Sequence, residues 1–130
     1  MDYDDSKGTH RLIAVVAVKT TNVLNGSWGH WRGPAAKRKK QRQATIAAMN
    51  EQHPQRMTVP FPIEVLLRRV APSNGLDDDA LPASLKSIRD GLTDWMGLKN
   101  DRTPLIRWTY DQRRGKPREY LVEIEITQRT

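Results

Sequence analysis

The chain of 130 residues is long enough for one domain with one hydrophobic core. It contains no cysteine, which excludes disulfides, thiolate zinc sites and a cysteine nucleophile. Its 22 Lys and Arg residues exceed its 15 Asp and Glu residues, and the resulting net charge of +7 predicts a polyanionic partner.

The chain begins with a predicted tail and a predicted strand. Residues 1–10 contain few apolar side chains and predict a disordered tail, so the domain is expected to span residues 11–130. The run RLIAVVAVK from Arg11 is apolar on both faces, which predicts a fully buried strand. It is too short to span a bilayer and no signal-peptide pattern precedes it, so we expect a soluble, cytoplasmic protein without a membrane partner.

A helix is predicted from Pro34 to Gln52, where good helix formers follow the proline. His53-Pro54 ends the pattern. Trp28 and Trp31, in the loop before this helix, are expected to cover an edge of the core, although they also suit stacking on bases. The first turns of the helix contain a run of basic residues, which either form a solvated helix face or contact DNA phosphates: Lys37, Arg38, Lys39, Lys40 and Arg42.

A second strand and a second helix flank an acidic loop. Apolar residues alternate at period two over residues 59–67, and prolines 60 and 62 favour an edge strand or the beginning of a strand. Arg68 and Arg69 follow as further candidates for DNA contact. The turn PSNG leads into three aspartates, and apolar residues at helical spacing from Leu81 predict a helix that Gly97 caps.

The last part of the chain predicts two strands. LIRWTYD and EYLVEIEIT alternate around the turn QRRGKP, which predicts a hairpin. The turn carries another candidate DNA-binding patch, made by Arg113, Arg114 and Lys116. The predicted order is β-α-β-α-β-β, a single α+β domain with two main helices on a mixed sheet.

The acidic residues allow two interpretations. If the chain is extended there, Asp77 and Asp79 point the same way, and two such carboxylates suit Mg²⁺ or Mn²⁺. Alternatively, Asp79 caps the helix and its neighbours favour the positive end of the helix dipole. Lys86 and Asp90, four residues apart, are by themselves typical of an exposed ion pair. Asp78 is the least distinctive of the three aspartates.

The run LDDDALPASLKSIRDGLTDWMGLKND, followed by IRWTYDQRRGK and YLVEIEI, resembles the RusA-type Holliday-junction resolvases, especially those of phages and prophages. The likeness covers residues 76–126 well and the first half more loosely, through NGSWGHWRGPAAKRKKQR. That family pairs an Asp-x-Asp-Asn entry to a helix with a later Lys and Asp, and another Asp after the helix. The resemblance implies a RusA-like fold in which the metal-binding catalytic residues are Asp77, Asp79 and Asp101, with Lys86 and Asp90 as further catalytic residues.

The resemblance implies a Mg²⁺-dependent endodeoxyribonuclease, with Mn²⁺ as a substitute, that resolves Holliday junctions or other branched DNA by paired nicks in a bacterial host cell. Two symmetric nicks predict a homodimer. No glycine-rich phosphate loop occurs, so no nucleotide cofactor is expected. Ala80 departs from the family, which usually has Asn there, and this favours an alternative, a catalytically weakened junction-binding protein of a phage recombination module. A third interpretation is a basic interaction domain whose aspartates only cap a helix.

Overall fold

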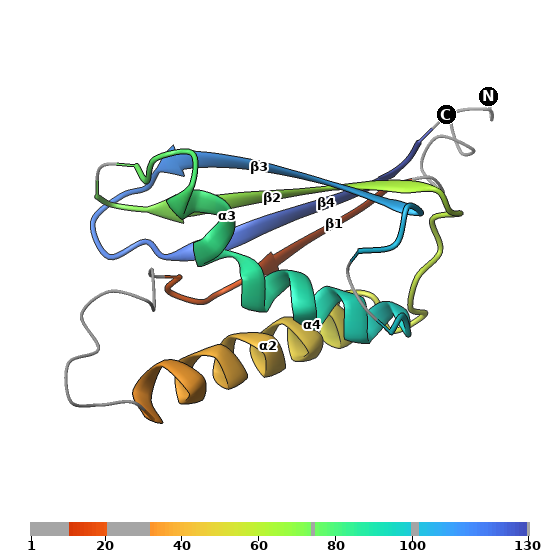
Figure 1. Ribbon diagram of the computed structural model, residues 1–130, viewed down its shortest axis with the longest axis horizontal. Coiled ribbons are helices and arrows are strands. Elements are labelled where there is room, and N and C mark those ends of the chain that lie inside the picture. The colour runs from red at the N-terminus through yellow and green to blue at the C-terminus, as the bar shows by residue number, and fades with distance from the viewer. Residues whose placement is uncertain (1–10, 21–31, 74, 100–101, 130) are drawn as a thin grey trace.

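The computed structural model describes residues 11–20, 32–73, 75–99 and 102–129, with the backbone alone for residues 32–34. The predicted tail at residues 1–10, as well as Trp28, Trp31 and Asp101, lies outside these residues. Helices cover one face of a four-stranded mixed sheet (Figure 1). The predicted α+β class and the order β-α-β-α-β-β are confirmed, with the second helix in two pieces.

Strand β1 (Arg11–Val16) lies at one edge of the sheet, whose strand order is β1-β4-β2-β3. Its side chains alternate between buried and exposed, and Ile13 and Val15 are 54% and 40% exposed. The prediction that both faces are buried is wrong because the helices cover only one face of the sheet.

Helices α2 (Arg32–Gln52) and α4 (Lys86–Met96) pack side by side and run in the same direction (Figure 1). Their backbones approach closely at Gly91, where a Cβ would lie 2.7 Å from the carbonyl oxygen of Arg42. The predicted end of the first helix at Gln52 is confirmed. Within the described part of the chain, no helix has the length and apolarity needed to cross a membrane.

Strand β2 (Ile63–Ala71) lies between β4 and β3, so the prediction of an edge position is wrong. The alternative, that the prolines mark the beginning of the strand, fits better, since Pro62 directly precedes it. Every second side chain from Ile63 to Leu67 is fully buried against the helices. Burial of such an apolar face contributes the most free energy when the strand has a central position in the sheet.

Strands β3 (Ile106–Arg114) and β4 (Leu121–Gln128) do not form the predicted hairpin. β3 pairs in parallel with one side of β2, and β4 pairs antiparallel with the other side. The connection 115–120 therefore crosses the end of β2, where the amide of Gly115 donates a hydrogen bond to the carbonyl of Ala71. A Cβ at Gly115 would lie 2.8 Å from Val70, so glycine suits this close crossing.

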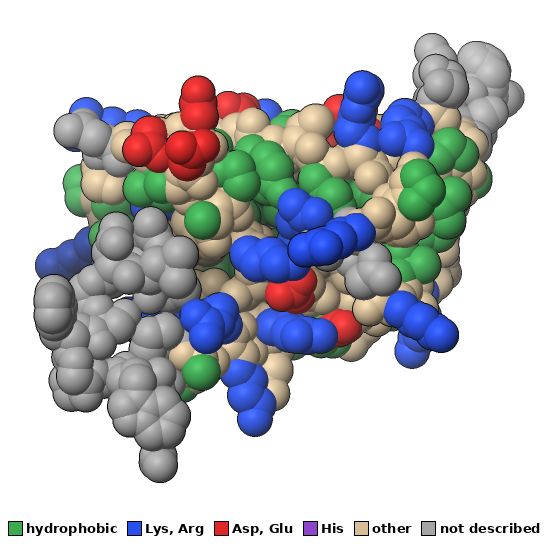
Figure 2. Space-filling model, viewed as in Figure 1, with side chains coloured by type: hydrophobic (Ala, Val, Ile, Leu, Met, Phe, Trp, Pro, Cys, Tyr) green, Lys and Arg blue, Asp and Glu red, His purple; other side chains and the backbone are tan. Residues whose placement is uncertain are grey.

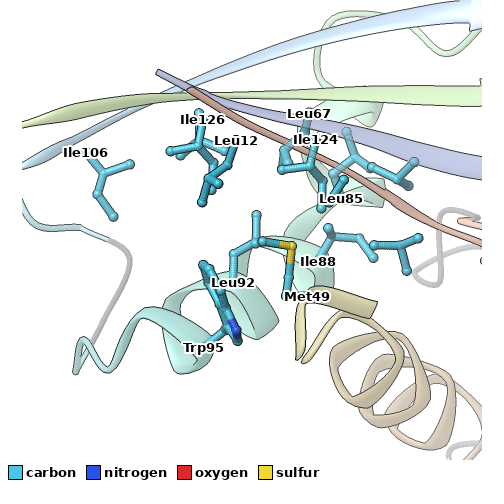
Figure 3. Close-up of a cluster of buried hydrophobic side chains, with 14 of the residues drawn as sticks. Leu12, Met49, Leu67, Leu85, Ile88, Leu92, Trp95, Ile106, Ile124 and Ile126 are labelled. Atoms are coloured by element: carbon cyan, nitrogen blue, oxygen red, sulfur yellow. The ribbon is translucent and has the colours of Figure 1, made fainter. Parts of the chain in front are cut away.

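The core fills the space between the sheet and the helices (Figure 3). The predicted second helix is broken into α3 (Ala80–Ser84) and α4 at the fully buried Leu85. Gly97 ends α4 with a left-handed φ of 78°, as predicted. Of the apolar side chains at the predicted helical spacing, Met96 is partly buried and the others are buried in the core, namely Leu85, Ile88, Leu92 and Trp95.

Candidate functional site

The loop between β2 and α3 is fastened to the end of β3 by one side chain, that of Gln112. The Oε1 atom of Gln112 accepts a hydrogen bond from the amide of Leu76 at 2.8 Å, and its Nε2 atom donates one to the carbonyl of Leu76 at 2.7 Å. A Cβ at Gly75 would lie 2.9 Å from this side chain, so glycine permits the close approach. The backbone that leads into the three aspartates is therefore held in place. No sequence pattern singled out Gln112.

The three aspartates form a tight turn at the start of α3. Asp77 Oδ1 accepts a hydrogen bond from the amide of Ala80 at 2.8 Å, and its carbonyl accepts one from Leu81 at 3.0 Å. Asp79 has helical φ and ψ of −83° and −38° and makes no capping hydrogen bond. The helix cap is thus Asp77, and the interpretation that Asp79 caps the helix is wrong. The stretch is also not extended, so period-two geometry does not align Asp77 with Asp79.

All three aspartates are exposed to solvent. Figure 2 shows acidic side chains gathered at the corner of the molecule where α3 begins. Within the described residues no Lys, Arg or His forms an ion pair with Asp77, Asp78 or Asp79. In a chain with a net charge of +7, these carboxylates form a cluster of negative charge that no cation of the described residues pairs with.

Lys86 and Asp90 lie in the first turns of α4 and form an ion pair at 3.0 Å, as expected from their spacing. Their side chains are 52% and 32% exposed, so the pair itself adds little stability. Among the described residues no three acidic or His side chains are grouped to hold a metal ion. Because Asp101 lies outside those residues, the set of Asp77, Asp79 and Asp101 stays a prediction.

The basic side chains predicted on α2 fall into two kinds. Arg42 binds Asp94 of α4 through two hydrogen bonds, Nε to Oδ2 at 2.5 Å and a terminal nitrogen to Oδ1 at 2.9 Å. These bonds to Asp94 raise the pKa of Arg42 and tie the two helices together. The remaining cations are exposed to solvent: Lys37, Arg38, Lys39 and Lys40.

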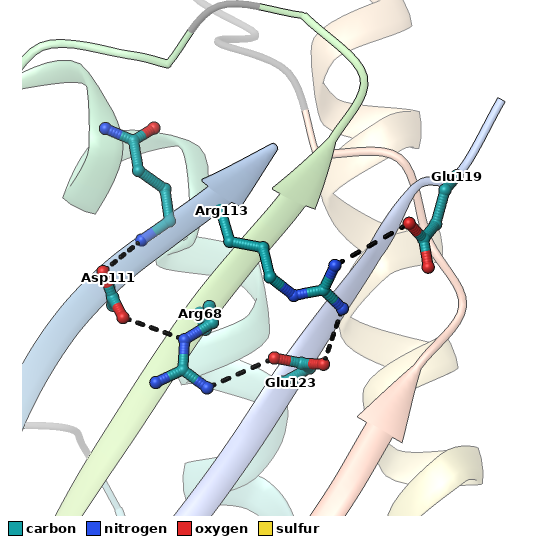
Figure 4. Close-up of polar contacts among 6 residues, drawn as sticks. Arg68, Asp111, Arg113, Glu119 and Glu123 are labelled. Atoms are coloured by element: carbon teal, nitrogen blue, oxygen red, sulfur yellow. Dashed lines mark hydrogen bonds and ion pairs between the residues drawn. The ribbon is translucent and has the colours of Figure 1, made fainter. Parts of the chain in front are cut away.

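On the face of the sheet away from the helices, Arg68 and Arg113 belong to an ion-pair ladder (Figure 4). Arg68 bonds Asp111 at 2.8 Å and Glu123 at 3.2 Å. Arg113 bonds Glu123 at 2.9 Å and reaches Glu119 at 3.8 Å. The bond from Arg68 lowers the pKa of Asp111, and bonds from Arg113 and then Arg68 lower the pKa of Glu123. Two of the predicted DNA-binding cations are thus already neutralised within the protein.

Arg69 and Arg114 lie on the other face of the same strands and have a different environment. Arg69 is only 7% exposed, and its Nε donates a hydrogen bond to the carbonyl of Thr20 at 3.3 Å. Burial lowers the pKa of Arg69. No carboxylate of the described residues pairs with Arg69 or Arg114. Both line a cleft of about 260 Å³ beside the acidic loop, together with Ser73, Gly75, Gln112 and Arg113.

Lys116, the last of the predicted cations, lies in the connection that crosses β2. Its backbone amide donates a hydrogen bond to Glu119 at 2.9 Å, and its side chain is exposed.

The chain matches no protein-family model and no curated protein.

Proposed function

We propose that the protein is a Mg²⁺-dependent endonuclease that nicks four-way junctions or other branched DNA. One observation carries the proposal: a fixed turn bears three carboxylates without a cation partner among the described residues, at the edge of a basic surface. A phosphodiester carries negative charge and has a poor leaving group, so its hydrolysis benefits from a metal ion held by carboxylates. The proposal follows the family resemblance of residues 76–126.

The donor groups in this turn fit Mg²⁺ or Mn²⁺, which prefer carboxylate and water oxygens. Asp77 uses Oδ1 for the amide of Ala80 and keeps Oδ2 for another contact. Asp79 makes no capping bond, so both of its oxygens are available. Asp101 is proposed to complete the set. When bound, the metal would polarise the phosphate and favour ionisation of the attacking water.

The side chains around the turn have separate proposed roles. Gln112 holds the backbone of Leu76, and the cap made by Asp77 limits movement of the turn. Lys86 supplies positive charge where negative charge grows on the phosphate in the transition state, and Asp90 orients its ammonium group. The exposed cations of α2 contact phosphates without regard to sequence. Paired nicks require two sites, so a twofold homodimer is part of the proposal.

The second candidate function is junction binding with weakened or no cleavage. Ala80 stands where the resembled family usually has Asn, and one oxygen of Asp77 is engaged as the helix cap. Both observations reduce the polar groups available for a metal site. The two functions make different predictions, because cleavage requires the carboxylates whereas binding does not.

The deciding experiment is a nicking assay on a labelled four-way junction and a matched linear duplex, with Mg²⁺, Mn²⁺ or EDTA. The test variant is Asp79→Asn, which removes a charge without removing a cap. The control is Asp111→Asn, which removes a carboxylate from the face of the sheet away from the helices. We expect metal-dependent nicks at the junction that Asp79→Asn reduces at least about 100-fold and the control leaves nearly unchanged. Junction binding without nicks in either metal would assign the second function.

A further inference from the structure

We infer that the cleft lined by Arg69 and Arg114 binds one backbone phosphate of the DNA strand that passes the acidic loop. This inference rests on the proposed function and adds a specific contact to it. The sequence grouped these arginines with Arg68 and Arg113 as one kind of basic patch. The structure separates them, since only Arg68 and Arg113 are paired with carboxylates of the ladder.

The first step of the argument is the burial of Arg69. Arg69 is only 7% exposed as a residue, and a guanidinium that loses part of its hydration normally needs a carboxylate or another anion nearby. The described residues give it the carbonyl of Thr20 and no anion. The protein therefore keeps a buried cation that a bound anion would compensate.

The second step is the position of Arg114. The pair of Ala71 with Arg114 in the parallel strands β2 and β3 lies two pairs beyond that of Arg69 with Gln112, so Arg114 and Arg69 are on the same side of the sheet. Both arginines line one cleft. Two guanidinium groups at one small opening favour an anion with several acceptor oxygens, and arginine binds phosphate through parallel hydrogen bonds.

The third step is the character of the cleft wall. Its remaining lining residues are Ser73, Gly75, Gln112 and Arg113, and no aromatic side chain on which a base could stack is among the described residues that line it. At about 260 Å³ the cleft has room for a phosphate group with part of its sugar. This chemistry recognises the backbone of a nucleic acid and does not read its sequence.

The fourth step is the distance to the acidic turn. Gly75, which lines the cleft, lies two residues before Asp77, so their Cα atoms are at most about 7 Å apart. Gln112 both lines the cleft and holds Leu76. A phosphate in the cleft would therefore fix the DNA strand next to the carboxylates.

The test is junction binding in EDTA, where no cleavage occurs, measured by fluorescence anisotropy over a range of salt concentrations. The variants are Arg114→Gln and Arg69→Gln, and the matched control is Arg107→Gln, an exposed arginine near the start of β3. We expect each variant to weaken binding about tenfold and to reduce the slope of log K against log salt by about 1. The control should leave the slope unchanged. Wild-type affinity and slope in Arg114→Gln would overturn the inference.

Folding is checked by thermal melting, since Arg69 is buried whereas Arg114 is exposed and its replacement should not affect the fold. Inorganic phosphate should raise the Tm of the wild type and raise that of Arg114→Gln less. Stabilisation by phosphate with unchanged DNA affinity in both variants would show a small-anion site and overturn the assignment to DNA. Loss of DNA affinity in the variants of a protein that never nicks would support the cleft and reject the nuclease function.

Discussion

Two arginine dipeptides, Arg68-Arg69 and Arg113-Arg114, differ in environment from one residue to the next. Arg68 and Arg113 lie on the open face of the sheet and bind Glu123. Arg69 and Arg114 lie on the helix side and line a cleft without a described carboxylate partner. Because side chains alternate along a strand, each dipeptide is divided between the faces. The comparison separates cations that stabilise the fold from cations that remain available for a ligand.

The largest effect is expected at Lys86, which lies on the helix side near the acidic turn. If its charge stabilises the transition state, Lys86→Met should lower the nicking rate about 100- to 1000-fold while junction affinity changes little. Lys99→Met is the matched control, since Lys99 is also exposed and follows the same helix. Single-turnover nicking assays at saturating protein measure the rate. Wild-type cleavage by Lys86→Met would remove this residue from the mechanism.

Gln112 and Asp111 are adjacent in β3 but lie on opposite faces of the sheet, so their replacements compare the two faces directly. Gln112→Ala removes both hydrogen bonds to Leu76, so the acidic turn loses its attachment to β3. We expect nicking to fall about 10- to 100-fold, the usual range when a support of a metal site is lost. Asp111→Asn, on the open face, should remain within about twofold of wild type. Equal effects of the two variants would contradict the division between the faces.

A smaller effect is expected for the ladder on the open face. Glu123→Gln weakens the contacts of Glu123 with both Arg68 and Arg113. Since these pairs are partly exposed, we expect a loss of about 0.5–1 kcal/mol in the free energy of unfolding at pH 7. Nicking should be unchanged. Urea unfolding measures the difference, and Glu64→Gln, on the same face but outside the ladder, is the control.

The ladder also predicts a dependence of stability on pH. The pKa values of Asp111 and Glu123 are lowered from ordinary values of 3.8 and 4.5. Their contribution is therefore complete above these ordinary values and is lost as pH falls through the lowered ones. The stability difference between wild type and Glu123→Gln should shrink as pH falls from 6 to about 3. A difference that grows toward low pH would contradict the assigned ion pairs.

Patterns within one element predicted much of the fold. Helical spacing identified five apolar residues of this helix, of which four are buried and Met96 is partly buried; the buried ones are Leu85, Ile88, Leu92 and Trp95. The end of α2 and the cap at Gly97 also followed from local chemistry. These features depend on neighbours within a few residues, so the sequence alone contains the relevant information.

The errors concern contacts between distant parts of the chain. Two alternating strands near a turn favoured a hairpin, but the more apolar β2 lies between them. The exposure of one face of β1 could not be predicted from the sequence, because a strand that is apolar on both faces has the same sequence pattern whether or not a second layer covers the sheet. Likewise, the role of Gln112 depends on a loop 36 residues earlier in the chain.

The smallest effect is expected at Ala80, the position that departs from the resembled family. Its amide is already bound by Asp77, and its side chain is partly buried in the first turn of α3. An Asn there adds an amide that can hold a neighbouring carboxylate, so Ala80→Asn should raise nicking a few-fold at a helix cost of about 0.5 kcal/mol. Ala83→Asn, an exposed position of the same helix, carries the same propensity cost and should not raise nicking. If Ala80→Asn creates nicking in a protein that only binds junctions, the acidic turn was incomplete; if it changes nothing in an active enzyme, the carboxylates suffice without the amide.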